Sequence, residues 1–223
     1  MKNERYARLV AARKDCRVCP QLANPSVVES GVLDSDRIGP YSQWQGNLDA
    51  PLVVVGQDFA DTSTFRRVQG WPGERVATNK NLVRLLAAAG FSVPLPRIGS
   101  PDDTLFFTNA VLCLKQGSMQ RAIPSSCFQA CAQRFLRPTI DLVAPRAVAA
   151  LGAGALGAVL LAYGLRSPGP LLELVVAGVT FDLPSGARVF PLCHPSPTVH
   201  ATTRSLALQE SDWSRVGEWL RAA

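Results

Sequence analysis

Polar side chains stand where three apolar segments of the sequence end. Gly56, Gln57 and Asp58 follow the apolar run LVVV. Asn109 interrupts the run TLFFTNAVL, and His194 follows RVFPLC. A polar residue in such a place either caps a turn or forms the floor of an active site. Which of the two applies depends on whether the fold brings these residues together.

The cysteines are a second group of residues that could do chemistry. Cys16 and Cys19 form a CxxC pair, and Cys113, Cys127 and Cys131 follow much later. A CxxC pair can be a redox centre, half of a zinc site or half of an iron–sulfur site. This pair follows a helical pattern instead of a strand, and no second close CxxC completes a zinc ribbon. The spacing favours a metal or cluster that pins the N-terminal segment to the body, with buried free thiols as the alternative.

The elements that must position these residues alternate between strands and helices. The expected strands span residues 52–55, 104–112, 146–151 and 188–193. The expected helices span residues 4–14, 78–89, 124–143 and 205–221, with one more after Gly152. This order predicts an α/β fold, a three-layer α/β/α sandwich with a central, mainly parallel, four-stranded sheet. Ligands bind beyond the carboxyl ends of such strands, so the three polar sites are expected to meet at one rim.

Two further expectations concern local structure. Thr78 or Asn79 can cap the second helix, and Gly90 can end it. Residues 171–183 are expected to form an antiparallel excursion from the sheet. We expect a single domain over residues 1–223, in which residues 1–50 form an N-terminal helix, the CxxC pair and an irregular segment packed on the body.

The bulk composition agrees with a globular protein. The chain has 223 residues, of which 47% are hydrophobic and 18% charged. Its net charge of +6 favours a polyanionic partner, although many basic proteins never touch nucleic acid. No apolar run approaches the ~20 residues that a membrane helix needs, and the charged N-terminal segment lacks the apolar core of a secretory signal. We therefore expect a cytoplasmic protein without a membrane partner, acting as a monomer.

In their order along the chain, these motifs resemble the uracil-DNA glycosylase superfamily. The similarity runs from CRVC at residues 16–19 to HPSP at residues 194–197. The sequence GQD at residues 56–58 is similar to the water-activating motif GQDPY of the family 1 enzymes. The segments NAVLC, CAQRFL and PRAVAALG are similar to the iron–sulfur family 4 enzymes. The resemblance implies an enzyme that flips uracil out of single- or double-stranded DNA and hydrolyses the N-glycosidic bond, which leaves an abasic site in base-excision repair.

The family 4 resemblance also implies a structural 4Fe–4S cluster. Its ligands would be Cys16, Cys19, Cys113 and Cys131. Cys127 stays open as the fourth ligand in place of Cys131, because the chain carries an insertion relative to the family spacing.

The resemblance assigns catalytic and base-binding roles to the strand-end residues. Asp58 would orient the attacking water and stabilise the oxocarbenium-like transition state. His194 would donate a hydrogen bond to uracil O2, and the amide of Asn109 would pair with O4 and N3–H, which rejects cytosine. Gly56 and Gln57 would line the uracil pocket.

An aromatic side chain must also stack on the extruded base. Trp71 is the first candidate, because QGWPG resembles the GRPF segment of the iron–sulfur families. Phe65 and Phe59 are the others. The DNA backbone would be contacted by the Pro-Ser turns and the residues after them, namely Pro195, Ser196, Pro197, Thr198 and Arg204. Arg204 could instead cap the last helix.

One departure from the family pattern bears on base selectivity. Family 1 enzymes carry a tyrosine two residues after the aspartate, where it blocks the methyl group of thymine, whereas this chain has Ala60. The alternatives are therefore a glycosylase of broader specificity, acting on hypoxanthine, xanthine or mismatched thymine, and a non-catalytic or abasic-site-capturing DNA-binding protein on the same fold. A redox protein unrelated to DNA is the remaining alternative. We expect a monofunctional glycosylase that uses water as its nucleophile.

Overall fold

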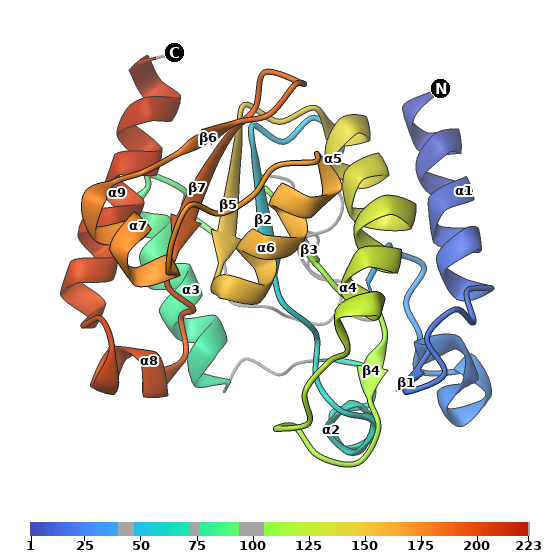
Figure 1. Ribbon diagram of the computed structural model, residues 1–223. Coiled ribbons are helices and arrows are strands. Elements are labelled where there is room, and N and C mark those ends of the chain that lie inside the picture. The colour runs from blue at the N-terminus through green and yellow to red at the C-terminus, as the bar shows by residue number, and fades with distance from the viewer. Residues whose placement is uncertain (40–46, 72–75, 94–104, 223) are drawn as a thin grey trace.

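A five-stranded sheet forms the centre of the computed structural model, which describes residues 1–39, 47–71, 76–93 and 105–222. The strand order is β3-β2-β5-β7-β6 (Figure 1). These strands are β2 (Leu52–Gly56), β3 (Phe106–Asn109), β5 (Ala147–Leu151), β6 (Phe181–Asp182) and β7 (Arg188–Leu192). The first four in spatial order run parallel, and β6 pairs antiparallel with β7 at one edge.

Helices cover both faces of this sheet and make three layers. The helices are α1 (Lys2–Lys14), α2 (Thr62–Arg67), α3 (Ala77–Ala88), α4 (Ser125–Cys131), α5 (Arg137–Val143), α6 (Ala153–Ala162), α7 (Leu171–Ala177), α8 (Pro197–Thr202) and α9 (Leu206–Ala222). Val53 and Val55 of β2 pack in a core with α1, α4, α5, α6 and α7. Leu52 and Val54, which alternate with them, pack against α3 and α9 on the other face. The three-layer α/β/α arrangement is thus confirmed.

The N-terminal segment adds a small second sheet. The two-residue strands β1 (Leu22–Ala23) and β4 (Leu114–Lys115) pair antiparallel, with Leu22 opposite Lys115. The 3₁₀ segment η1 (Pro25–Gly31) follows β1. This pairing ties the segment after the CxxC pair to the chain that follows β3.

The structure differs from the expected elements in three places. Residues 171–183 form the helix α7 and then the short strand β6, whose antiparallel pairing with β7 confirms part of the expected excursion and gives the sheet a fifth strand. The helix at 124–143 is divided by the π-helical segment η2 (Ala132–Leu136). Helix α3 begins at Ala77 after Val76, so neither Thr78 nor Asn79 is its cap. Both of these side chains instead line a pocket at the sheet rim.

Strand β7 contains a proline at a position where no sheet bond is lost. The amide of Arg188 donates to the carbonyl of Arg146 on the β5 side. Because hydrogen-bonding directions alternate along a strand, the nitrogen of Pro191 faces the outer edge. Strand β6 pairs only as far as Val189, so a proline is tolerated at position 191.

Within the described ranges, no helix combines the length and the apolar character that crossing a membrane requires.

Candidate active site

The carboxyl ends of β2, β3, β5 and β7 meet at the lower edge of the sheet in Figure 1, close to α8. A cavity of about 700 Å³ opens there, and we call it the rim pocket. Its lining includes Gly56, Gln57, Asp58, Asn109 and His194. The parallel topology thus brings together residues from positions 56 to 194, as the sequence predicts.

Close packing between neighbouring strands explains two glycines beside the pocket. Gly56 lies opposite Asn109 in the β2–β3 register. A Cβ atom on Gly56 would lie 2.0 Å from Oδ1 of Asn109, so only glycine leaves room for this amide. On α6, a Cβ atom on Gly154 would lie 2.3 Å from Oε1 of Gln57. The amides of Asn109 and Gln57 therefore occupy space that any side chain at position 56 or 154 would fill.

Asp58 is partly buried and is held through one of its two carboxylate oxygens. Its side chain is 8% exposed. Oδ2 accepts a hydrogen bond from Nε2 of Gln57 at 2.9 Å and lies 3.2 Å from Nζ of Lys115. Among the described residues, no hydrogen bond or ion pair engages Oδ1. That oxygen is available to accept a proton from a water molecule.

His194 is half-buried at the edge of the same pocket. Burial lowers its pKa below the ordinary value, and the negative charge of Asp58 only partly offsets this effect. The imidazole is therefore neutral near pH 7 and can donate a hydrogen bond without transferring a proton readily. The competing histidine, His200, lies next to Asn81, whose Nδ2 is 3.2 Å from its Nδ1. The same Asn81 nitrogen donates to the carbonyl of Pro195, which anchors the turn after His194.

The three aromatic candidates lie in different environments. Phe59 lines the rim pocket, as does Phe107 of β3. Phe65 is fully buried with Val28 and Leu114, so it cannot stack on a base. Trp71 is not among the pocket-lining residues, and it borders residues 72–75, which the structure does not describe.

The position of the expected thymine gate is occupied by backbone and small side chains. Ala60 lines the pocket and is 3% exposed. Its carbonyl accepts the amide of Lys115 at 3.0 Å. Met119 also lines the pocket, and its sulfur accepts the amide of Asp61. No large side chain therefore stands at position 60, although Phe59 and Met119 are nearby.

The residues predicted to contact DNA lie at the start of α8. The buried Pro195 lines the pocket, and Ser196 is the N-cap of α8, where its Oγ accepts the amide of Val199. Pro197 and Thr198 are exposed on the first turn. A nucleic-acid backbone could reach this turn from solvent.

Arg204 has a structural partner. Its Nη2 donates to Oδ1 of Asp212 at 2.8 Å, its Nε pairs with the other oxygen, and the side chain of Asp212 is 3% exposed. This pairing joins the end of α8 to α9. It favours the structural alternative for Arg204, and a phosphate contact remains a prediction.

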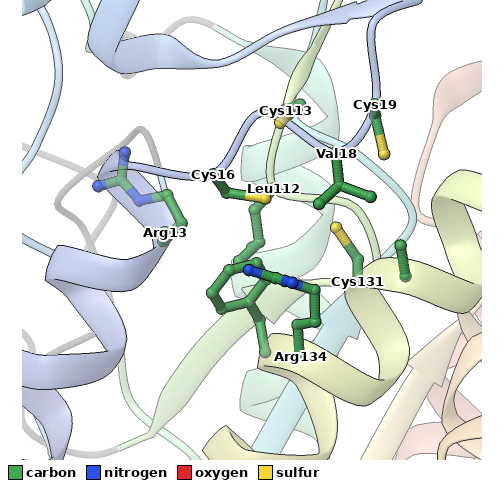
Figure 2. A pocket seen from close by; sticks show the side chains of 10 residues that line it. Arg13, Cys16, Val18, Cys19, Leu112, Cys113, Cys131 and Arg134 are labelled. Carbon is green, nitrogen blue, oxygen red and sulfur yellow. The ribbon is translucent and has the colours of Figure 1, made fainter.

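Four predicted ligands line a second, smaller pocket (Figure 2). Cys16 and Cys19 come from the loop after α1, Cys113 from the segment after β3, and Cys131 from the last residue of α4. Burial, followed by the charge of neighbouring thiols, raises the pKa of Cys113 to about 12. Burial also raises the pKa of Cys131, to about 11. Thiols with such a pKa stay protonated near pH 7 unless a cation compensates the thiolate, so these values fit buried free thiols as well as metal ligands.

Two observations limit the assignment of ligands. The thiol of Cys127, which is 1% exposed, is close enough to Cys19 to help raise the pKa of Cys19, after burial, so Cys127 stays a competitor of Cys131. Across the described ranges, no three or more His, Cys, Asp or Glu side chains converge as they would around one metal ion. A four-iron cluster distributes its thiolates over several atoms, so it needs less convergence than one zinc ion.

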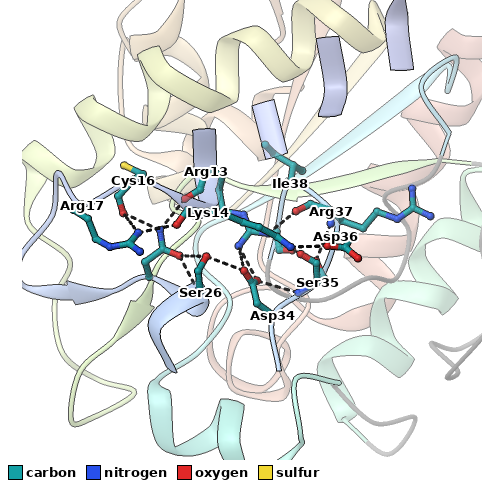
Figure 3. A network of polar contacts seen from close by, with 12 residues as sticks. Arg13, Lys14, Cys16, Arg17, Ser26, Asp34, Ser35, Asp36, Arg37 and Ile38 are labelled. Carbon is teal, nitrogen blue, oxygen red and sulfur yellow. Dashed lines mark hydrogen bonds and ion pairs between the residues drawn. The ribbon is translucent and has the colours of Figure 1, made fainter. Parts of the chain in front are cut away.

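A buried polar network positions the loop that carries the CxxC pair (Figure 3). Nη1 of Arg13 lies 2.6 Å from Oδ2 of Asp34, and these side chains are 1% and 2% exposed. Nδ2 of Asn24 donates to the carbonyls of Arg13 and Cys16. Nε of Arg13 is buried without a hydrogen-bond partner in the described residues, and Arg13 lines the cysteine pocket. An unpaired donor at this place fits a group that presents sulfur atoms as acceptors.

Several residues in or beside the rim pocket were not predicted from the sequence. Lys115 touches Asp58, Asn81 anchors the turn after His194, and Phe107 lines the pocket. Asn79 lines it too, and its Nδ2 is buried without a partner in the described residues. The sequence could have indicated Phe107, because it lies two residues before Asn109 on a predicted strand and so on the same face. It could not have indicated Lys115 or Asn81, since only long-range packing brings them to the site.

Comparison with protein families locates this site within a known domain. The model of the uracil DNA glycosylase superfamily matches residues 43–217. The matched region includes the four parallel strands and the lining of the rim pocket, whereas Cys16 and Cys19 precede it. No curated protein shows significant similarity to the chain.

Proposed function

The chain belongs to the uracil-DNA glycosylase superfamily, and from this membership we propose that it excises uracil from DNA. The family places its reaction among hydrolyses of N-glycosidic bonds and makes DNA its substrate. The finer proposal is a monofunctional uracil-DNA glycosylase that leaves an abasic site in base-excision repair. The observation that carries it is that Asp58, Asn109 and His194, far apart in sequence, line one pocket.

In the proposed reaction, a water oxygen forms a bond to C1′ of the sugar as the bond from C1′ to N1 of uracil breaks. The electron pair of that bond leaves with the base. Asp58 stabilises the cationic sugar and accepts the proton of the water through its free oxygen Oδ1. The neutral His194 donates a hydrogen bond to O2 of the departing anion.

Recognition of the base is assigned to the amide of Asn109. The amide offers both N–H donors and an acceptor oxygen, which match O4 and N3–H of uracil and not the amino group of cytosine. Phe59 and Phe107 are the aromatic side chains of the pocket that could stack on the flipped base. Trp71 remains a third possibility for this role.

A specific observation supports broader specificity as a second candidate function. Ala60 leaves no bulky side chain where the family's gate tyrosine excludes thymine. Hypoxanthine, xanthine and mismatched thymine are therefore included as competing substrates.

We further assign a structural 4Fe–4S cluster to Cys16, Cys19 and Cys113, with Cys131 as the fourth ligand and Cys127 as its competitor. When bound, the cluster would crosslink the N-terminal loop to the domain body and supply no redox step. All six cysteines are free, as the reducing cytoplasm would keep them. We assign contacts with DNA phosphates to the turn formed by Ser196, Pro197 and Thr198, which Pro195 supports from the pocket side. We also propose that the protein acts as a monomer.

A labelled oligonucleotide assay tests the proposed function. Strands with one uracil, hypoxanthine or mismatched thymine are incubated with the protein and then cleaved with alkali at abasic sites. Wild type should generate the product from uracil, while Asp58→Asn and His194→Ala should lose most activity. No release from any strand, or undiminished release by both variants, contradicts the proposal. A stable covalent protein–DNA adduct would favour the abasic-site-capturing alternative.

A further inference from the structure

A buried lysine contacts the proposed water-activating carboxylate. Lys115 lines the rim pocket, and its side chain is 9% exposed, close to the 8% of Asp58. Its Nζ lies 3.2 Å from Oδ2 of Asp58 and donates to the carbonyl of Met119 at 2.9 Å. A buried charge is costly unless it is paired, so each of these two groups depends on the other.

The contact is selective for one oxygen of the carboxylate. Lys115 and Gln57 both engage Oδ2, and within the described residues Oδ1 has no partner. One hydrogen bond and one ion pair on the same oxygen restrict the rotation of the carboxylate about its Cβ–Cγ bond. They therefore direct the other oxygen toward the space where water would bind.

The backbone around Lys115 strengthens this arrangement. Its amide donates to the carbonyl of Ala60 at 3.0 Å, and Lys115 forms a parallel bridge with Asp61. On its other side, Lys115 pairs with Leu22 of β1. The backbone of Lys115 is thus held between the loop that carries Asp58 and the N-terminal segment. These contacts fix the position from which its side chain reaches Asp58.

We propose that Lys115 is a positioning residue of base excision, which holds Asp58 through Oδ2 so that Oδ1 faces the attacking water. This inference rests on the proposed function, because it assigns Asp58 to water activation. The lysine would not touch the substrate. Its effect should therefore fall on the chemical step and should depend on the presence of a carboxylate at position 58.

A double-mutant cycle in single-turnover uracil excision tests this dependence. Lys115→Met should lower the rate of base release by about 10²-fold, the typical cost of a misplaced catalytic group. The affinity for the uracil-containing oligonucleotide should stay nearly constant, and Lys115→Arg should recover part of the rate. In an Asp58→Asn background, Lys115→Met should cause little further loss. The control Lys2→Met removes a solvent-exposed lysine–aspartate pair, Lys2–Asp49, and should leave the rate unchanged.

Two outcomes of the double-mutant cycle would contradict the positioning role of Lys115. An equally large loss in the Asp58→Asn background, or a full wild-type rate for Lys115→Met, overturns the role of Lys115. If Lys115→Met does not fold, as thermal unfolding will show, Lys115→Arg is taken through the same cycle. A wild type that releases no base defeats the proposed function and this inference with it. A wild type that is active alongside an equally active Lys115→Met defeats this inference alone.

Discussion

Replacing Gly56 by alanine should impair base recognition through a single added methyl group. The new Cβ atom would lie 2.0 Å from Oδ1 and 3.2 Å from Cγ of Asn109. Side-chain contacts to a Cβ atom under 3.0 Å essentially do not occur, so the amide must move by about 1 Å. A displacement of this size at a catalytic site can cost about 10²-fold in rate, which corresponds to about 2.7 kcal/mol of transition-state stabilisation.

The assay is kcat/KM for uracil excision, with Gly157→Ala as the matched control. Gly157 lies on α6, and a Cβ atom there would meet nothing within 4 Å. This control should keep full activity and gain slightly in stability, because alanine favours a helix over glycine. Gly56→Ala should also lose discrimination between uracil and cytosine. A Gly56→Ala protein with wild-type kcat/KM would refute the placement of Asn109 in base recognition.

Three further predictions concern stability, the cluster and pH. Asp34→Asn leaves the buried Arg13 without its charge partner and should cost about 3–5 kcal/mol, lowering Tm on the order of 10 °C in thermal unfolding; an unchanged Tm would contradict this. The purified protein should absorb near ~400 nm, and of Cys127→Ser and Cys131→Ser only the variant that lacks the true fourth ligand should lose this band; a colourless wild type that carries zinc would contradict the cluster. Burial lowers the pKa of His194 in the folded state, so below about pH 6.5 the unfolded chain binds more protons than the folded one. Wild type should therefore lose more stability on acidification through this range than His194→Ala does. Denaturant titrations at several pH values measure this difference.

The layers of the fold could be predicted because each main strand carries its own signal. The runs LVVV and AVAAL are buried on both faces, and such continuous apolar segments are typical of parallel strands between helices. The fifth strand could not be predicted in the same way. Strand β6 has two residues, and its pairing with β7 depends on tertiary contacts. The sequence does carry signals for the helix α7, namely Pro170 before its first turn and Gly178 after its last, where the structure has a left-handed conformation.

Some residues of the site could be predicted from the sequence and others could not. Asp58, Asn109 and His194 could be placed together because a topological rule carries strand ends to one rim. Lys115 could not, because it reaches Asp58 through a two-residue strand and an isolated bridge. A lysine side chain is usually solvated, and nothing in the local sequence marks this one as buried.

The proline in β7 has a consequence for the outer edge of the sheet. Strand β6 covers β7 only at Arg188 and Val189, and the next outward-facing nitrogen belongs to Pro191, which is buried. The helix α7 also packs against β7, and the carbonyl groups of a helix are used by its own hydrogen bonds. Replacing this proline would therefore place an N–H donor at a buried position where no strand accepts it, whereas proline leaves no donor to satisfy.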